Sequence, residues 1–571
     1  MSAKIQHLLL LAAVSAIPQA AMAQGGQPGG EYVIQGIFSP TIADARKIDL
    51  RPQPLDTILP DRPVSYQLLT VQADIPPRVD SIAPARLTVL SPQPRLYKGY
   101  VKAGFGLYTT PLGELHFDQT RSRMNTWGLH AKHFSSNGGI DDVGPSDYSF
   151  NSIDGHYAHF LPEHEVAGRL IYDRRRVSYY GYTASDSISA EQGVIVAPED
   201  FSKQIYNDVG FAGRLRSLYK DSTRLAYDAG MEVHAYSNLS GSRETNIRFG
   251  ADLGKREGNE HFTLGVLVDN NAYRADLGGL LGEERISGTL LGLTPAVSTT
   301  GRKYVVRVGA GLFLDAQGRS TFHFYPNFFA SYSLFEDILV PYAGVDGRKE
   351  RNSFRSLTRE NPWLTGAPNL VNTNRQYDVF GGLRGSFSRH LGFDVRVSTA
   401  RIGEMPLFVN LPNEPFGDRM AVIYDQVDIL TLSGELRYRL RESISFNGRM
   451  EVMSYEVKNQ AEAWNLPPYR LSLGGRYSMR DKLILKAEAQ FLGRRPAFRL
   501  PVPPLPGELP NPSTTVELDG FMDLYLGAEY RYTKRLSVFL DMSNLSASKY
   551  ERWSKYPVQR GLVMGGATYA F

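Results

Sequence analysis

The chain beyond residue 96 alternates between apolar and polar positions with a period of two. In the first such segment, residues 97–107, Val101 and Phe105 share one parity while Lys98 and Lys102 take the other. Side chains two residues apart on a β-strand point to the same side, so each segment predicts a strand with one apolar and one polar face. The pattern recurs at Tyr377–Phe387, Phe393–Val397, Tyr469–Tyr477, Leu483–Phe491 and Met522–Tyr532.

Apolar and polar residues alternate along the strands of both a soluble β-sandwich and a membrane barrel. Strand length and connection length distinguish the two folds. The segments are about ten residues long, which is what a tilted strand needs to cross a bilayer. Connections also alternate between short and long, as periplasmic turns and outer loops do in barrels. The short ones are Leu161–His164, Leu218–Ser222, Leu334–Asp337, Arg441–Ser443, Asp481–Lys482 and Lys534–Arg535; the long ones are Asn137–Asp147, Thr183–Asp200, Asp276–Arg285, Ser356–Thr373, Asn410–Asp418, Lys458–Leu466 and Arg499–Glu517.

These observations predict an all-β fold. Residues 97–571 are expected to form a large antiparallel transmembrane β-barrel of about 22 strands, an even number as bacterial barrels require. A short irregular N-terminal segment is expected to precede it.

The first 23 residues, Met1–Ala23, have the features of a secretory signal peptide. Lys4 is followed by the apolar run Leu8–Ala16, and the small residues Ala21 and Ala23 stand at the −3 and −1 positions of a cleavage site. A buried N-terminal helix fits less well, because the apolar run is short. The chain has no cysteine, which excludes a lipoprotein anchor at this point and any disulfide. The sequence therefore predicts an exported protein.

The next segment, Gln24–Leu96, holds 11 of the 34 prolines and shows little alternation. Proline lacks a backbone N–H and restricts the residue before it, so this segment is predicted to be extended or irregular. We expect it to lie in the periplasm or in the barrel lumen.

Composition agrees with a barrel and argues against two other classes. No apolar run after the signal approaches the roughly 20 residues of a transmembrane helix. The mean hydropathy of −0.28 is low, yet the chain has 32 Tyr, 28 Phe and 54 Gly, as expected when lipid-facing and lumen-facing residues alternate. A net charge of +4 from 63 basic and 59 acidic residues gives no concentrated basic surface, so no nucleic-acid partner is predicted.

The last residues of the chain include a terminal aromatic pair. Tyr569 and Phe571 share the outward parity of the last strand, and this end resembles the signal that the barrel insertion machinery reads. Over about the last 30 residues, the chain also has Asn544-Leu545, Lys549-Tyr550-Glu551 and Arg560-Gly561, and this series with Tyr569 and Phe571 resembles the C-terminus of TonB-dependent receptors of the outer membrane. It implies a barrel of this family's size in the cell outer membrane.

The front of the chain departs from that family. The resemblance implies a full N-terminal plug domain, and Gln24–Leu96 is too short for one. Glu31–Ile34 is similar to a TonB box only as a short apolar tetrapeptide, so coupling to TonB is left open. The run Gly104–Tyr108 with the following Thr109-Thr110-Pro111 resembles the first hairpin of plugless receptor-like barrels of Bacteroidota.

Candidate metal ligands are sparse. His130 and His133, like His156 and His159, are three residues apart, and on a strand this odd offset sends the two side chains of each pair to opposite faces. Neither pair is therefore expected to share a metal. Asp141, Asp142 and Asp147 offer oxygen ligands for Ca²⁺, but solvated carboxylates are the favoured interpretation. No metal site and no cofactor are predicted.

No catalytic motif stands out. Gly104-x-Gly106 lacks the third glycine and the helix of a dinucleotide site, and is better explained as glycine on a strand. No Gly-x-Ser-x-Gly nucleophile motif occurs. An embedded hydrolase that assembles Ser, His and Asp from several strands is the remaining enzymatic hypothesis. The prediction is that the protein is not an enzyme.

Two charged segments suggest contacts outside the barrel. Arg174-Arg175-Arg176 is followed by Tyr179, Tyr180 and Tyr182, which fits lipopolysaccharide phosphates and an aromatic girdle, or else an ordinary solvated strand end. The second segment, Pro501–Pro512, follows Arg494-Arg495 and should be stiff and close to polyproline II. It could cover the pore mouth, contact a surface partner or be a passive loop.

Two functions remain in competition. In the first, solute or ligand passes through or is held in the lumen, and Gln24–Leu96 acts as a partial plug or gate. In the second, the barrel is a non-transporting scaffold subunit of an envelope complex, which docks partners such as a surface lipoprotein. The predicted lumen-lining side chains are Lys98, Lys102, Arg384, Arg396, Arg470, Arg476, Lys486, Glu488, Asp523, Glu529 and Arg531.

Overall fold

The computed structural model describes residues 96–119, 122–182, 203–276, 282–411, 419–499 and 515–571. Several predictions concern residues outside these ranges: the signal peptide Met1–Ala23, nearly all of Gln24–Leu96, the whole of Thr183–Asp200 and the proline-rich loop Pro501–Pro512. The domain boundaries that depend on them stay predictions.

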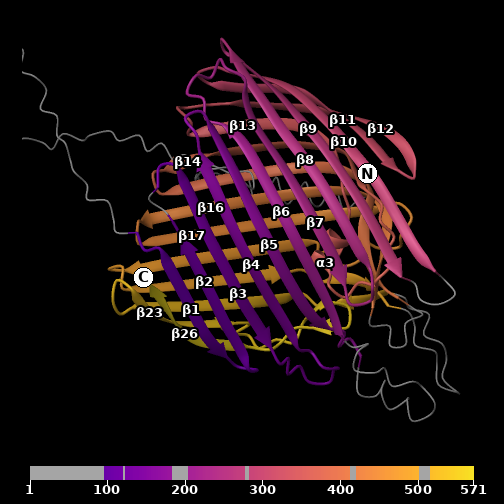
Figure 1. Cartoon of the computed structure of the whole chain (residues 1–571), viewed down its shortest axis with the longest axis vertical. Coiled ribbons are helices and arrows are strands. Elements are labelled where there is room, and N and C mark those ends of the chain that lie inside the picture. Colours follow the sequence, from indigo (N-terminus) through magenta and orange to yellow (C-terminus); the bar gives the residue numbers. More distant parts are fainter. Residues whose placement is uncertain (1–95, 120–121, 183–202, 277–281, 412–418, 500–514) are drawn as a thin grey trace, which may run out of the picture. The chain divides into compact units, whose positions relative to one another are not determined.

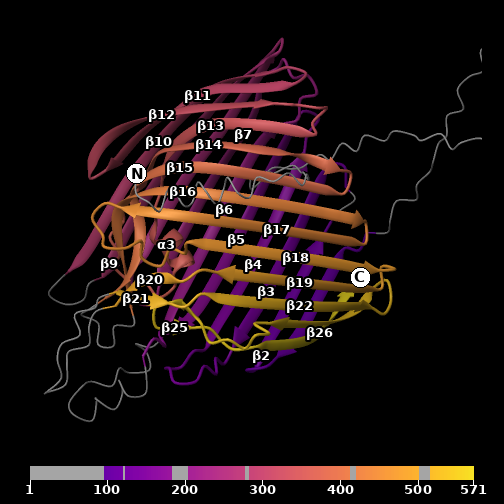
Figure 2. The same ribbon diagram turned by 180° about the vertical axis from the view of Figure 1, so that it is seen from behind.

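The described residues form one antiparallel sheet of 22 strands that closes on itself, as predicted. Each strand pairs with its neighbours in chain order, and β1 pairs with β26 to complete the barrel (Figures 1 and 2). The wall strands are β1 Gly99–Gly106, β2 Thr110–Asp118, β3 Asn125–Ser136, β4 Tyr148–Phe160, β5 His164–Ser178, β6 Lys203–Ser217, β7 Ala226–Asn238, β8 Arg243–Glu257, β9 Glu260–Asp276, β10 Glu283–Thr300, β11 Tyr304–Gln317, β12 Arg319–Tyr332, β13 Leu339–Glu350, β14 Thr373–Ser388, β15 Leu391–Asn410, β16 Met420–Arg441, β17 Ile444–Val457, β18 Tyr469–Met479, β19 Leu483–Leu492, β22 Phe521–Arg531, β23 Leu536–Ser543 and β26 Leu562–Ala570.

Three smaller structures lie in the connections. Two hairpins, β20 Arg495–Phe498 with β21 Thr515–Leu518 and β24 Glu551–Trp553 with β25 Tyr556–Pro557, form between wall strands. One short helix, α3 Phe354–Glu360, follows β13. Among the described residues, no helix is both long and apolar enough to span a bilayer.

The barrel has two unlike ends, which we call the turn end and the loop end. The turn end carries Phe571 and short connections such as Leu161–Glu163 and Arg480–Lys482. The loop end carries the longer connections, including residues 137–147, 351–372 and 458–468. The alternation of short and long connections expected from the sequence is therefore present, although the loop end also has the very short links Leu107–Thr109 and Gly318.

Each strand has an outer and an inner face, as the alternation predicts. On β10, Leu291, Leu293 and Val297 are exposed, whereas Leu290 is buried. Their partners across the pair with β9 are Val268, Val266 and Phe262, so whole rows of the outer face are apolar. Toward the loop end the rows become polar, and the outward pairs there are Asn270 with Thr289, Ala272 with Ser287, Arg274 with Arg285 and Asp276 with Glu283.

Many strands are longer than the ten residues expected. β1 has 8 residues, but β15 has 20 and β16 has 22. The sequence pattern did not show this, because the loop-end parts of long strands lose their apolar outer residues and with them the alternation on which the prediction relied.

Closure of the barrel depends on small residues at the seam between β1 and β26. Gly104 lies opposite Gly566 and Phe105 opposite Gly565. A Cβ on Gly566 would overlap the Ala103 carbonyl oxygen and the Phe539 ring. At the turn end, the backbone N–H groups of Lys98 and Gly99 donate to the Phe571 carbonyl oxygen at 2.9 and 3.0 Å. The seam therefore needs glycine, because backbone and ring occupy the space of a side chain.

A methyl group at Gly566 should weaken the barrel. We expect Gly566→Ala to lower the free energy of unfolding by about 1–3 kcal/mol, the usual cost of overpacking. Gly250→Ala is the matched control, because nothing lies within 4 Å of a Cβ there. Equilibrium urea unfolding of the refolded barrel, followed by tryptophan fluorescence, measures both. Equal stabilities of the two variants would contradict this account of closure.

Candidate functional site in the lumen

The connection between β13 and β14, residues 351–372, folds inward and narrows the barrel interior. Its helix α3 lies within the outline of the wall in both opposite views (Figures 1 and 2). The connection contacts strands far from it in the sequence, including β6, β8 and β9. We call residues 351–372 the lumen loop. The sequence predicted a loop here, Ser356–Thr373, but neither its helix nor its position inside the barrel.

Local sequence explains where α3 begins and ends. The Ser353 hydroxyl accepts from the Ser356 backbone N–H at 3.1 Å, and the Ser356 hydroxyl accepts from the Ser353 N–H at 2.9 Å. This reciprocal capping box satisfies two donors of the first turn. Pro362 disfavours helical backbone at Asn361, which is the C-terminal cap.

Aromatic side chains of the wall hold α3 in place. Phe354 is fully buried, and its ring centroid lies 5.2, 5.6 and 6.3 Å from those of Tyr273, Tyr236 and Tyr206. The tyrosine hydroxyls also bond to the loop: Tyr206 donates to the Pro362 carbonyl oxygen at 2.8 Å. Tyr273 donates to the Gly366 carbonyl oxygen, and the Tyr236 hydroxyl bonds to the Thr358 hydroxyl at 2.7 Å. Each tyrosine thus gives an apolar face to the helix and a hydrogen bond to the loop.

Acidic residues of the wall fix the two ends of the helix. The Glu244 carboxylate, 2 % exposed, accepts from the backbone N–H groups of Phe354 and Arg355 at 2.5 and 3.2 Å. A carboxylate is favourable at this end because the helix dipole is positive there. Asp208 accepts from Arg355 at 2.6 Å and from Arg359 at 2.9 Å. The Asp208 and Glu244 carboxylates are buried, so their contacts are screened less than surface ion pairs.

The legs of the lumen loop are tied to the wall and to each other. The Arg351 guanidinium donates to the Asp269 and Gly288 carbonyl oxygens at 2.9 and 3.1 Å and to the Gln317 side chain at 3.1 Å. Asn352 donates to the Val371 carbonyl oxygen at 2.8 Å and so joins the two legs. These hydrogen bonds therefore fix the position of the lumen loop inside the barrel.

Within the loop, burial inside the barrel lowers the pKa of the Arg359 guanidinium, and the neighbouring Arg355 acts in the same direction. Asp208 and Asp173 oppose this shift. Arg359 pairs with both carboxylates, at 2.9 and 3.0 Å. An arginine stays charged at neutral pH, so the pairs persist.

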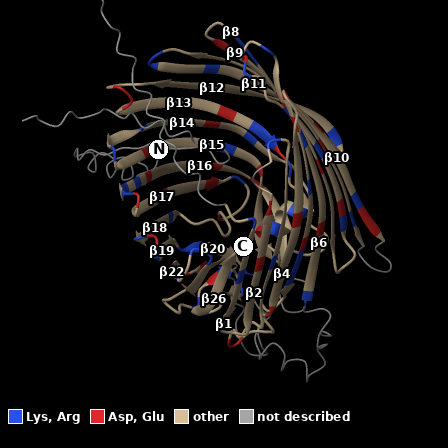
Figure 3. Cartoon of the chain, turned by 60° about the vertical axis from the view of Figure 1, so that its left-hand side comes forward, with Lys and Arg blue, Asp and Glu red and all other residues tan. Residues whose placement is uncertain are grey.

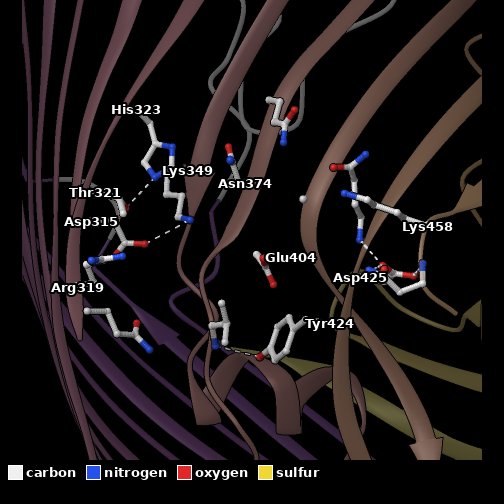
Figure 4. Close-up of a pocket in the computed structure, with 16 residues that line it drawn as sticks. Asp315, Arg319, Thr321, His323, Lys349, Asn374, Glu404, Tyr424, Asp425 and Lys458 are labelled. Carbon is white, nitrogen blue, oxygen red and sulfur yellow. Dashed lines mark hydrogen bonds and ion pairs between the residues drawn. The ribbon is translucent and has the colours of Figure 1, made fainter.

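Beside the lumen loop lies a polar cavity of about 530 Å³, which we call the lumen cavity. Figure 4 shows its charged side chains on facing walls: Asp315, Lys349 and Arg319 on one side, Asp425 and Lys458 on the other. Lys349 and Asp315 form an ion pair at 3.3 Å. Asp425 is held by the backbone N–H groups of residues 459 and 460, each at 2.8 Å.

Between these walls, Glu404 projects into the lumen cavity (Figure 4). It lies at an irregularity where the register of β15 with β16 shifts between Ile402 and Met405. Its backbone has a φ of +51°, in the left-handed region, and Thr373 donates to its carbonyl oxygen at 3.0 Å. Such bulges re-aim side chains. Here the bulge turns a carboxylate toward the space beside the loop.

Apart from Lys98, the predicted lumen-lining residues lie on β1, β14, β15, β18, β19 and β22. Lys102, Lys486 and Glu529 line a second cavity of about 100 Å³ next to the seam, together with Asp541 and Tyr525. Arg396 pairs with Asp378 at 3.2 Å and lies over the Phe380 ring. Arg384, Arg470, Arg476, Glu488, Asp523 and Arg531 each lie one position from an exposed apolar residue of the outer face, and Lys98 precedes β1. That they line a conducting lumen stays a prediction.

Sequence reasoning missed most of the residues around the lumen loop. Glu244, Asp208 and Tyr206 occur in ordinary strand segments, and only the fold brings them to a helix 110–150 residues later. Local signals for the helix did exist, in the Ser353–Ser356 spacing and the Asn361-Pro362 stop. The lumen-cavity residues Asp315, Lys349 and Glu404 carried no motif.

The candidate Ca²⁺ ligands and the arginine cluster that the sequence suggested lie near the loop end of the barrel. Asp147 pairs with Arg176 at 2.7 Å and Asp142 with Lys549 at 3.5 Å, so two of the three candidate Ca²⁺ ligands contact basic side chains. Arg174-Arg175-Arg176 lies within β5, near its loop end. Contact of this cluster with lipopolysaccharide stays a prediction (Figure 3 shows the charged positions along the wall).

Comparison with known proteins shows which solved structures share this fold. No family model matches the chain. No curated protein matches it either. Among solved structures, the FrpB iron transporter from Neisseria meningitidis is similar with a TM-score of 0.62 and 9 % identity, over 84 % of this chain and 82 % of that one.

Two more solved structures are similar at the same level. The pyoverdine outer membrane receptor FpvA from Pseudomonas aeruginosa gives a TM-score of 0.60 and 12 % identity, over 84 % of this chain and 79 % of that one. The siderophore receptor PirA from Acinetobacter baumannii gives 0.61 and 10 %, over 83 % and 80 %. The protein therefore shares the large barrel fold of these outer-membrane receptors, as the resemblance of its C-terminus implied.

Removing the aromatic anchor should release the lumen loop without unfolding the barrel. Phe354→Ala is expected to cost about 3–5 kcal/mol of local stability, which raises the open population roughly 100-fold or more. Trypsin cleavage after Arg355 and Arg359, followed by mass spectrometry, should accelerate accordingly. Phe335→Ala is the control, because that ring is 72 % exposed in a turn. Cleavage at the same rate in both variants would show that the ring does not anchor the loop.

Proposed function

We propose that the protein lies in the cell outer membrane and lets a polar or charged solute pass or be taken up across it. The observation that carries the proposal is the closed 22-strand barrel with a polar cavity beside an inward-folded loop. The similar solved structures support it, because they are an iron transporter, a pyoverdine receptor and a siderophore receptor. Their ligands are not transferred to this chain.

The outer face supports a membrane position. Its apolar rows lie toward the turn end, for example Val268 opposite Leu291 on β9 and β10, and outward polar pairs begin with Asn270 and Thr289. A transmembrane barrel has such an apolar band about 25 Å tall. In this proposal the turn end faces the periplasm, and the polar loop-end parts of the long strands extend beyond the lipid on the outer side.

The lumen cavity supports a solute with several polar groups. Acidic and basic side chains that accept or donate hydrogen bonds face the lumen cavity, among them Glu404, Asp425, Lys349 and Arg319. A volume of about 530 Å³ lies within the usual range for small-molecule sites. An apolar ligand would displace water from these groups without offering hydrogen bonds in return, at a cost in free energy.

The length of Gln24–Leu96 predicts less than a full plug, so coupling to TonB stays open in this proposal, and with it the scaffold alternative. In the transport hypothesis, Gln24–Leu96 and the lumen loop would share the task of restricting the lumen. In the scaffold hypothesis, the barrel is closed and its loops dock an envelope or surface lipoprotein. No catalytic motif favours an enzymatic function, and we propose none.

Conductance in planar bilayers separates the two hypotheses. We expect the purified protein to open discrete channels, and deletion of residues 24–96 or the substitution Phe354→Ala to raise the conductance, because each widens the passage. The control Phe335→Ala should conduct like the parent. Silence of all four forms, with envelope proteins co-purifying, would favour the scaffold function instead.

Because the chain has no cysteine, single cysteines can test which side chains face the conducting lumen. We expect Lys486→Cys, on the inner face, to react with a charged, water-soluble thiosulfonate and change the single-channel conductance. Leu485→Cys, the neighbour on the outer face and 39 % exposed, should leave it unchanged. A conductance change with Leu485→Cys but not with Lys486→Cys would refute the assignment of the two faces.

A further inference from the structure

We propose that Glu114, His116 and His130 form a binding site for one divalent transition-metal ion, of the zinc or copper type, on the inner wall of the barrel. Glu114 and His116 belong to β2 and His130 to β3. One ligand atom from each lies within 4.8 Å of the other two. This inference goes beyond the proposed function and does not depend on it.

Strand register brings the three residues together. His116 on β2 is directly opposite His130 on β3, which in turn is opposite Asp154 on β4. Their row alternates with an outward row that contains the exposed Ile153. The two imidazole rings stack with centroids 4.1 Å apart. Sequence spacing could not show this, because it related His130 only to His133.

The contacts around His130 leave one nitrogen aimed at the site. The Nδ1 of His130 lies 3.1 Å from the Asp154 carboxylate, so Nδ1 carries the proton and donates it. The other nitrogen, Nε2, is buried without a hydrogen-bond partner. It lies 3.6 Å from the Glu114 carboxylate oxygen. In the neutral form of His130 with the proton on Nδ1, the Nε2 lone pair faces an anionic oxygen, an arrangement that a cation between them would stabilise.

The remaining contacts fit a metal site with an outer support. The Nε2 of His116 lies 2.7 Å from the same Glu114 oxygen, so an ion would replace the proton that they now share. Asp154, which orients His130, is itself held by Arg169 at 3.0 Å. A carboxylate on the far nitrogen of a ligating histidine is the usual second partner of such sites.

The donor set indicates the class of ion. Two imidazoles and one carboxylate suit Zn²⁺ and Cu²⁺, whereas Ca²⁺ and Mg²⁺ prefer oxygen ligands alone. Three protein ligands leave a coordination position for water or another molecule. The side chains of His116, His130 and Glu114 are 38 %, 27 % and 22 % exposed on the inner wall, so an ion could reach them from the lumen.

The test is metal binding by the full-length protein, purified without a polyhistidine tag and stripped with a chelator. Calorimetric titration with ZnCl₂ and with CuCl₂ should show one saturable site. His116→Ala and His130→Ala should each weaken it at least 10-fold. His133→Ala is the matched control: this histidine is exposed on the other face of β3, with Asn151 2.7 Å from its Nδ1, and should bind like the parent.

Two further variants separate a metal site from a merely structural cluster. Asp154→Asn, at the positioning residue, should weaken binding about 10- to 100-fold. Lys132→Gln should tighten it, because Lys132 is the cross-strand neighbour of Glu114 and its charge opposes a bound cation. Electron paramagnetic resonance of the Cu²⁺ form should show coupling to two imidazole nitrogens, reduced to one in His116→Ala.

Before titration, electrophoresis of boiled and unboiled samples checks that each variant is folded. A folded barrel migrates more slowly after boiling than before it. Absence of a saturable site in the folded parent protein would overturn the proposal. So would equal binding by the parent, His116→Ala and His130→Ala. In either case the three side chains are better explained as a hydrogen-bonded polar cluster of the inner wall.

Discussion

The structure depends on one constraint: every backbone N–H and C=O of the wall must find a partner on a neighbouring strand. In lipid no water is available to satisfy them, so a sheet can span a membrane only when it is closed. Here closure is the pairing of β1 with β26, where Gly104 meets Gly566 and the terminal Phe571 carbonyl accepts two N–H groups. Once the ring is complete, side chains on the outer face are free to be apolar and those on the inner face to be polar.

This constraint explains how much of the fold could be predicted. Alternation around Val101 and Phe105, or along Met522–Tyr532, reports the two faces directly, and the number of such segments gave the strand count. The terminal Tyr569 and Phe571 added the type of barrel. Strand lengths were less accurate, since residues such as Asn270 and Arg274 belong to the wall without facing lipid.

The candidate sites could not be predicted in the same way. Phe354 packs against Tyr206, Tyr236 and Tyr273 only because the barrel brings distant strands around one interior. For the same reason Glu244 accepts hydrogen bonds from the start of α3. The cluster of Glu114, His116 and His130 requires the register of β2 with β3, which one sequence does not state. Individual lumen charges such as Lys102 and Lys486 could be named from parity, but not the cavity that they share.

The fastening of the lumen loop has a mechanical consequence. Asn352 joins its legs across to Val371, and Arg351 fixes its base to Asp269 and Gly288. The part beyond these ties is bonded to the wall on two sides: Asp208 on β6 and Glu244 on β8 hold its helix, and Leu364 pairs with Met420 at the start of β16. The lumen loop is therefore a strut across the interior, because it joins strands that lie many positions apart in the wall. Such a cross-brace resists a change in the barrel's cross-section at this level, which the wall strands alone would resist only through their own pairing.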